Sequence, residues 1–305
     1  MKLLFFGLPL AALLLAEDGH DIALAVLSPI PASGKRRLRR HIGAERVLSA
    51  AELGAGLDAA VERRLGLLAP DLIVSWYWTR RLPERWLRTA RLGGIGVHPS
   101  LLPRHRGPNP FFWTINLGDE ETGVTVHRLA RDYDTGAIVD QERMFVGERD
   151  GWQLARALDR PSLAALRRTV ARLSRGEPLT ERAQNDFEAT WAPEPKGELL
   201  HVDFRWQTER VLRTIRALSP VPGLAVEIGG QPLFITRAEV TGHVIAALEP
   251  GEAAVIGEPP QLSIRTGDGA IAVKKAVAGE GGPLTAGREL ESSAIALLVR
   301  GGRSV

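Results

Sequence analysis

A histidine and an aspartate, each next to turn-forming residues, are the side chains best placed for chemistry. His98 ends the apolar run of residues 93–97 and opens the sequence His-Pro-Ser-Leu-Leu-Pro, whose two prolines exclude regular helix and central strand. Asp134 follows a second apolar run and opens Asp-Thr-Gly. Because strand ends on the carboxyl side of an open α/β sheet converge on one crevice, we expect these two side chains to meet there.

An imidazole beside a carboxylate is held in one tautomer, and its cationic form is favoured. Such a pair suits acyl transfer to an amine, in which the amine loses a proton and the carbonyl oxygen becomes negative in the tetrahedral state. The alternative is that His98 caps a turn and Asp134 begins one, since Asp-Thr-Gly is common in plain turns. Either residue alone is better explained as part of a turn, whereas the two motifs together favour a site.

A metal site is a second interpretation of the same region. His98, His105, His127 and Asp134 are side-chain types that bind zinc or iron. Their spacing matches no compact ligand motif, and the chain has no cysteine. We therefore predict no metal, no disulfide and no thiol catalysis.

Three consecutive aromatic residues, Trp76, Tyr77 and Trp78, follow another apolar run. At a strand end they can wall a flat heteroaromatic ligand. Core packing is the alternative, and alternation along a strand places at least one of them in the core.

The order of apolar and turn-forming segments predicts an α/β fold. Strands are expected at 2–8, 21–28, 70–75, 94–98, 123–129 and 137–146, and helices at 10–16, 49–68, 83–90, 110–117 and 151–174, the last broken or kinked at Pro161. This alternation predicts a Rossmann-like, doubly wound sheet over residues 1–185. Gly7-Leu8-Pro9 lacks the GxGxxG pattern, so a dinucleotide is not predicted.

A polar, proline-rich stretch divides the chain, and we interpret residues 186–200 as a linker. Beyond it, one helix at 206–218 precedes short strands at 224–228, 233–240, 253–256, 262–265 and 271–277. Gly229-Gly230 and Asp268-Gly269 suit tight hairpins. Residues 201–305 are therefore expected to form a small, OB-like β-barrel.

Charge and hydropathy restrict the class of protein only weakly. The net charge is +3, and a basic cluster at residues 35–40 is interpreted as a solvated helix start, with a phosphate contact as the alternative. The apolar N-terminus is interrupted by Gly7 and Pro9, and no segment reaches the ~20 apolar residues of a membrane span. We expect a cytoplasmic protein without a membrane partner.

These motifs, in this order, resemble the 10-formyltetrahydrofolate-dependent formyltransferases. The resemblance rests on Pro-Asp-Leu-Ile-Val at 70–74, His-Pro-Ser-Leu-Leu-Pro at 98–103, Thr-Gly-Val-Thr at 122–125 and Asp-Thr-Gly at 134–136. The second domain is similar to that of methionyl-tRNA formyltransferase-like proteins, through residues 202–206, 213–218 and 222–223. The resemblance thus covers nearly the whole chain.

The resemblance implies a formyl donor, 10-formyltetrahydrofolate, bound by the N-terminal sheet, and an acceptor amine nearby. It makes His98 the catalytic imidazole and Asp134 its carboxylate partner. Residues implied to contact the folate are Trp76, Tyr77, Trp78, Arg80, Leu82, Ser100, Thr125, His127 and Asp132.

One position departs from the family pattern. The family has Asn-x-His, whereas this chain has Gly96-Val97-His98. An oxyanion donor of this kind is typically worth ~10²–10³ in rate. We consider three explanations: a substitute donor (Asn109, His105 or Arg106), a roomier site in which Gly96 makes space, or a folate-binding protein that has lost catalysis.

The acceptor is predicted from two features. The segment of residues 28–47 is shorter than in tRNA-acting members, and residues 75–82 and 126–129 are more similar to formyltransferases of amino-sugar nucleotides. A small-molecule amine is therefore our first choice and initiator methionyl-tRNA the second, since the basic cluster and the barrel suit an RNA.

Overall fold

The computed structural model describes residues 1–242, 247–279 and 288–301, so the predicted C-terminal range lies partly outside the described residues. The chain forms two compact units. The N-terminal unit comprises Met1–Pro110, Thr122–Met144 and Ala157–Ala192, and the C-terminal unit comprises Phe111–Glu121, Phe145–Arg156 and Pro193–Val305.

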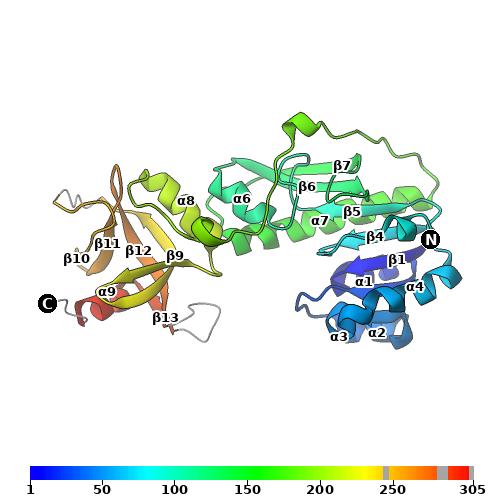
Figure 1. Cartoon of the computed structure of the whole chain (residues 1–305), viewed down its shortest axis with the longest axis horizontal. Coiled ribbons are helices and arrows are strands. Elements are labelled where there is room, and N and C mark those ends of the chain that lie inside the picture. Colours follow the sequence, from blue (N-terminus) through cyan, green and yellow to red (C-terminus); the bar gives the residue numbers. More distant parts are fainter. Residues whose placement is uncertain (243–246, 280–287, 302–305) are drawn as a thin grey trace. The chain divides into compact units, whose positions relative to one another are not determined.

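A seven-stranded sheet with strand order β3-β2-β1-β4-β5-β6-β7 organises the N-terminal part of the chain (Figure 1). Its strands are β1 (Lys2–Gly7), β2 (Asp21–Leu27), β3 (Val47–Ser49), β4 (Leu72–Trp76), β5 (Gly94–His98), β6 (Glu121–Arg128) and β7 (Ile138–Phe145). The first five strands run parallel, and β6 pairs antiparallel with β5. The predicted doubly wound, Rossmann-like sheet is confirmed.

The central strands are buried on both faces, which explains their nearly continuous apolar runs. Leu4 and Phe6 pack with Leu57 and Val61 of α4, while Leu3 and Phe5 on the opposite face are also fully buried. The helices of this part are α1 (Pro9–Glu17), α2 (Lys35–Ile42), α3 (Ala50–Leu53), α4 (Leu57–Leu68), α5 (Glu84–Leu87) and α7 (Gly151–Ser174).

Two helix predictions need correction. The single helix expected at 49–68 is interrupted by a 3-10 turn at Gly54–Gly56, because Gly54 has a positive φ of 49°. The expected break at Pro161 does not occur, since α7 continues through it for 24 residues. Packing compensates for the lost backbone hydrogen bond there, because Leu158, Ala165 and Leu166 are fully buried.

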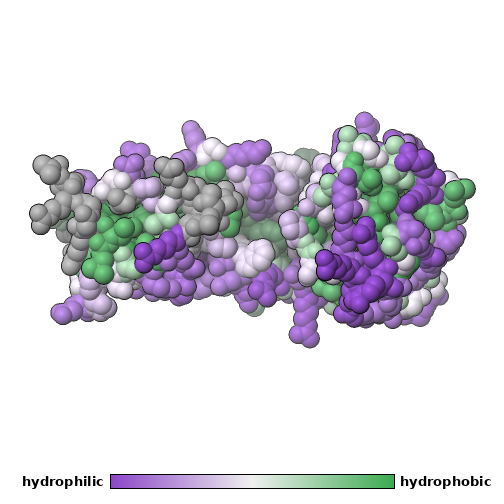
Figure 2. Space-filling model, turned by 90° about the horizontal axis from the view of Figure 1, so that it is seen from below, coloured by the Kyte–Doolittle hydropathy of each residue, from purple (hydrophilic) through white to green (hydrophobic). Residues whose placement is uncertain are grey.

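The basic cluster at residues 35–40 forms most of α2, and its cations are largely paired within the protein. Lys35 and Arg39 form ion pairs with Glu52, and Arg37 contacts Glu17 at 2.7 Å. The pairs are exposed, as expected for a solvated helix. Seen from below in Figure 2, the N-terminal unit presents many hydrophilic side chains.

The C-terminal unit contains a curled antiparallel sheet, as predicted for a small barrel-like domain (Figure 1). Its strand order is β10-β11-β12-β9-β8, with β13 also paired to β12. The elements are α6 (Pro110–Asn116), α8 (Thr208–Leu218), β8 (Leu224–Ile228), β9 (Gln231–Val240), β10 (Ala253–Ile256), β11 (Gln261–Arg265), β12 (Ala270–Ala278), β13 (Arg288–Glu291) and α9 (Ser292–Gly301). Both predicted hairpins are confirmed, joining β8 to β9 and β11 to β12.

Candidate active site

His98 is the last residue of β5, and its ring is held by the loop that follows. The side chain is buried, and Nε2 lies 2.7 Å from the carbonyl oxygen of His105. Ser100 stabilises the same loop, because its hydroxyl donates to the carbonyl oxygen of Arg104 at 2.6 Å. The loop thus folds back on His98 and fixes the orientation of its imidazole.

Thr125 anchors this loop to the neighbouring strand. Thr125 lies opposite His98 in the β5–β6 register. Its hydroxyl donates to the carbonyl oxygen of Ser100 at 2.7 Å and accepts hydrogen bonds from the backbone of Leu102 and the amide of Gln141. The hydroxyls of Ser100 and Thr125 therefore hold the loop in place, and their contact with folate stays a prediction.

Asp134 lies between two histidines. Its Oδ2 accepts a hydrogen bond from the backbone N–H of Gly107 at 2.9 Å and lies 3.4 Å from Nδ1 of His98. Its Oδ1 lies 3.5 Å from Nε2 of His127. The structure therefore brings the predicted His98–Asp134 pair together and adds His127, which had been assigned to folate contact.

The second nitrogen of each imidazole is held by a backbone carbonyl. A carbonyl only accepts, so Nε2 of His98 carries a proton toward His105 and Nδ1 of His127 carries one toward Arg128, at 2.9 Å. The atoms left available are therefore Nδ1 of His98 and Nε2 of His127, and both face the Asp134 carboxylate. An ionised carboxylate is also only an acceptor. Hydrogen bonds between Asp134 and the two rings therefore require one further proton, shared among these three side chains.

His127 occupies the space beside Gly96. A Cβ added to Gly96 would lie 3.0 Å from Nε2 of His127 and 3.0 Å from Cδ2 of Leu129. A side chain at this position would therefore crowd His127 and Leu129, and the expectation that Gly96 leaves room for a larger acceptor stays a prediction. The imidazole of His127 fills the room that the missing side chain would need.

Stability at acid pH is expected to report on His127. Burial holds its pKa below the usual range, opposed by Asp134, while His98 and Arg106 also face it. Below pH ~6.5 the imidazole of His127 takes up a proton in the unfolded chain but not in the folded chain. The free energy of unfolding therefore falls as the pH is lowered further, by at most about 1.4 kcal/mol per pH unit. Urea titrations between pH 8 and 5 should show a flatter dependence for His127→Gln, and equal slopes would contradict this.

The end of the predicted sheet domain and the first residues of the predicted linker contact the site directly. The amide of Gln184 donates to the carbonyl oxygens of Asp134 and Gly136, both at 2.7 Å, and its oxygen accepts from Nε of Arg106 at 2.9 Å. Backbone hydrogen bonds join Arg106 to Thr190 and Ala192. We call residues 182–192 the strap, because they tie the His98 loop to the Asp134 turn.

Gln184→Ala is expected to lower kcat by about 10- to 100-fold, because small displacements of reacting groups are costly. The variant removes the side chain that links Arg106 to the Asp134 turn. Asn185→Ala is the matched control, since the hydrogen bonds of the Asn185 side chain within the described part of the chain are made to Phe187 and Glu188. Steady-state kinetics should separate the two variants, and equal turnover would show that the strap does not position the site.

The aromatic residues at the end of β4 have different surroundings. Trp76 is buried and donates to Ser162 at 3.0 Å, and Trp78 packs edge-on against Phe6 with ring centroids 5.3 Å apart. Tyr77 has a positive φ of 55°, and burial raises the pKa of its phenol. Two of the three therefore serve the core, in line with alternation along a strand.

The other predicted contacts lie on different parts of the same unit. Arg80 is exposed and pairs with Asp58 at 3.2 Å, Leu82 joins the core of the sheet, and Asp132 is exposed near Arg81. The backbone N–H of Asn109 donates to Ala192. Among the described residues no group of three His, Asp or Glu side chains is arranged to hold a metal, and no helix there is long and apolar enough to cross a membrane.

Sequence reasoning missed the strap and Gln184. Gln184 reaches Gly136 and Asp134 across 48 and 50 positions of the chain. A local pattern of polar residues and prolines does not carry such a signal, so residues 182–185 were assigned to the sheet domain and residues 186–192 to the linker, without a role at the site.

Comparisons with known proteins identify the family. A family model described as formyl transferase matches residues 7–159, and one described as the formyl transferase C-terminal domain matches residues 196–292. Methionyl-tRNA formyltransferase of Thiobacillus denitrificans is 30% identical over 308 residues, covering 97% of each chain. GDP-perosamine N-formyltransferase of Brucella melitensis is 35% identical over 180 residues, covering 56% of this chain and 66% of that protein.

Solved structures share the fold at lower identity. An N-formyltransferase from Helicobacter canadensis, in complex with folinic acid and dTDP-3-aminofucose, has a TM-score of 0.67 at 16% identity and covers 90% of this chain and 98% of that one. HypX from Aquifex aeolicus, in complex with tetrahydrofolic acid, has a TM-score of 0.67 at 21% identity, with 97% of this chain covered. This chain spans 46% of HypX. From the two family matches and the relative aligned over nearly its full length, the chain belongs to the formyl transferase family.

Proposed function

We propose that this protein transfers a formyl group from 10-formyltetrahydrofolate to the primary amine of a small molecule such as an amino-sugar nucleotide. The observation that carries the proposal is the Asp134 carboxylate facing the available nitrogens of two imidazoles, at 3.4 Å and 3.5 Å. Backbone carbonyls hold the other nitrogen of each ring. The ring nitrogens available for proton exchange are therefore the two that face Asp134.

The reaction exchanges one C–N bond for another. The acceptor nitrogen forms a bond to the formyl carbon, the bond from that carbon to the folate nitrogen breaks, and one proton passes from the acceptor nitrogen to the folate nitrogen. No net proton is consumed, so the enzyme needs a group that takes up a proton and returns it. Nδ1 of His98 and the Asp134 carboxylate face each other at 3.4 Å and form the pair that takes up and returns this proton, while burial lowers the pKa of His127.

His127 supplies a polar acceptor, Nε2, beside Gly96. It occupies the room next to Gly96, and its ring has one nitrogen fixed on Arg128 and one facing Asp134. His127 of β6 thus places a buried polar side chain beside Gly96, the position at which the family has asparagine. Because the one N–H of the neutral ring is directed at Arg128, the substitute donor for the oxyanion comes from another group, for which Asn109 and Arg106 are the candidates.

The charge of the C-terminal part supports a small acceptor. Residues 193–305 contain 12 Lys and Arg and 13 Asp and Glu, a net charge of −1. Several cations there are paired with carboxylates, including Arg213 with Glu209 and Arg237 with Glu239, both at 2.9 Å. A surface that binds a nucleic-acid backbone is expected to carry an excess of unpaired cations.

Initiator methionyl-tRNA is the second candidate. A relative named methionyl-tRNA formyltransferase aligns along 97% of this chain, including the C-terminal domain, whereas the GDP-perosamine N-formyltransferase aligns along 56%. The basic helix α2 is the segment of the N-terminal unit best suited to an RNA contact, although three of its cations are already paired.

A panel of acceptors tests the proposal. The protein is supplied with 10-formyltetrahydrofolate and either amino-sugar nucleotides or methionyl-tRNA, and release of tetrahydrofolate and the mass of the formylated product are measured. We expect turnover with an amino-sugar nucleotide that His98→Ala lacks. Turnover with methionyl-tRNA alone would establish the second candidate, and folate binding without transfer to any amine would identify a silenced protein.

A further inference from the structure

Trp191 of the strap packs beside the active site and leaves much of its surface open to solvent. The residue is 54% exposed. Its ring lies against Gly107, because a Cβ added to Gly107 would lie 3.2 Å from each of two indole atoms, Cη2 and Cζ3. The backbone N–H of Gly107 donates to Oδ2 of Asp134 at 2.9 Å. One residue therefore contacts both the indole and the carboxylate of the site.

The backbone of Trp191 is fixed to the loop that follows β5. Trp191 forms a parallel bridge with Arg106, whose N–H donates to Thr190 at 2.9 Å and whose carbonyl oxygen accepts from Ala192 at 2.7 Å. Gly107 has a positive φ of 120°, and a Cβ there would also lie 3.0 Å from the carbonyl oxygen of Ala192. A glycine is therefore needed for the strap to approach so closely. Because the backbone already holds the indole in place, binding a ligand on it costs little ordering.

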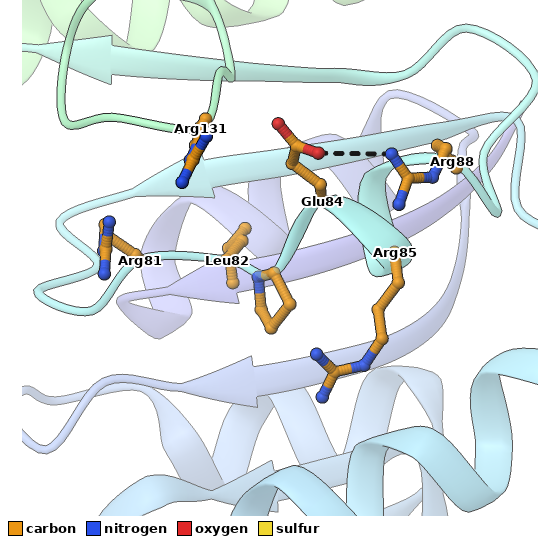
Figure 3. Close-up of a pocket in the computed structure, with 7 residues that line it drawn as sticks. Arg81, Leu82, Glu84, Arg85, Arg88 and Arg131 are labelled. Atoms are coloured by element: carbon orange, nitrogen blue, oxygen red, sulfur yellow. Dashed lines mark hydrogen bonds and ion pairs between the residues drawn. The ribbon is translucent and has the colours of Figure 1, made fainter.

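The turn that carries Asp134 also borders a second region, which Figure 3 shows. Arg131 of this turn lines an open pocket together with Arg81, Leu82 and the arginines of α5. Arg81 and Leu82 belong to the segment after β4, which the resemblance assigns to the folate. The acceptor amine must approach the formyl carbon from a side that the donor leaves open. The strap is a different element in contact with the same turn, so it is the element where we expect the acceptor.

We propose that Trp191 is the platform on which the amine-bearing sugar ring of the acceptor packs. The proposal rests on the proposed function. An indole is large, flat and apolar, so it suits a ring that has an apolar face and a polar rim. A hexose presents such a face through its C–H groups, while its hydroxyls stay hydrated. The base of a sugar nucleotide is separated from the amine by the sugar and the diphosphate, so the ring beside the His98–Asp134 pair is the sugar.

Steady-state kinetics with the amino-sugar nucleotide that turns over fastest in the acceptor panel test the platform. We expect Trp191→Ala to raise the KM for this acceptor about tenfold, a usual loss when one stacking ring is removed. The kcat and the affinity for 5-formyltetrahydrofolate should stay within about threefold, because the ring binds substrate and transition state alike. Trp191→Phe keeps a flat ring and should recover most of the affinity. Trp152→Ala is the matched control, because Trp152 is a similarly exposed tryptophan, at 60%, in the C-terminal unit.

A second probe separates the sugar from the base. The nucleoside diphosphate of the same acceptor lacks the sugar and the amine, so its inhibition constant should be equal for wild type and Trp191→Ala. A loss as large as that in KM would show that the indole binds the base and would overturn the inference. An unchanged KM, or a fall in kcat alone, would show that Trp191 only supports the loop, while the proposed function would stand. Absence of turnover with every amino-sugar nucleotide would remove the proposed function together with the inference.

Discussion

His98→Ala is expected to lower kcat for formyl transfer by about 10²–10⁴-fold, the usual contribution of a general acid–base group. The variant removes the nitrogen that faces Asp134 and leaves the rest of the loop supported by Ser100 and Thr125. Steady-state kinetics with a formyl acceptor identified from the panel measure the loss. The affinity for 5-formyltetrahydrofolate should remain within about threefold.

His105→Ala is the matched control for this prediction. Its backbone carbonyl, which orients the His98 ring, is retained in the variant. We expect His105→Ala to keep most of the turnover, whereas an equal loss in both variants would point to collapse of the loop. A His98→Ala protein with wild-type kcat would exclude His98 from the chemistry.

Gly96→Ala is expected to lower kcat by about 10- to 100-fold, because the added Cβ would lie 3.0 Å from Nε2 of His127 and displace the ring. Gly96→Asn adds the same Cβ together with an amide. We therefore expect it to show a similar loss, although it restores the side chain of the family pattern. The effect should appear in kcat rather than in the affinity for folate.

Gly94→Ala provides a control on the same strand. Its Cβ would meet Leu129 at 2.8 Å and Leu87 at 3.1 Å, so it crowds a shared neighbour without touching His127. Both variants should lose stability through overpacking, by about 1–3 kcal/mol. Only Gly96→Ala should lose kcat, and unchanged kinetics in that variant would remove His127 from the mechanism.

The sequence predicts those parts of the fold that neighbouring residues determine, such as short apolar strands and tight turns. The strands β1, β2, β4 and β5 are short apolar runs bounded by Gly, Pro or Asp, and the Gly-Gly and Asp-Gly turns suit hairpins. β3 is only three residues long and gave no pattern. Pro161 does not break α7, because the buried face of the helix compensates for a cost that local rules assign to the proline.

Part of the site could be predicted, because the carboxyl ends of strands in an α/β sheet converge on one crevice. His98 and Asp134 follow from the α/β pattern and the prolines and glycines beside them. The shared role of Asp134 was not predictable, because it depends on the orientation of two rings that are fixed by the carbonyls of His105 and Arg128. Contacts of Gln184 with residues about 50 positions away likewise have no local signature.

We expect formyl transfer to depend on a proton held between Asp134 and the imidazoles of His98 and His127. The most direct measurement is the single-turnover rate of formyl transfer by Asp134→Asn with the donor already bound. Asparagine preserves the size of the side chain and an oxygen for the backbone N–H of Gly107, but it removes the charge. We expect a rate at least about 10²-fold below wild type, with Asp140→Asn on β7 unaffected. A wild-type rate for Asp134→Asn would contradict it.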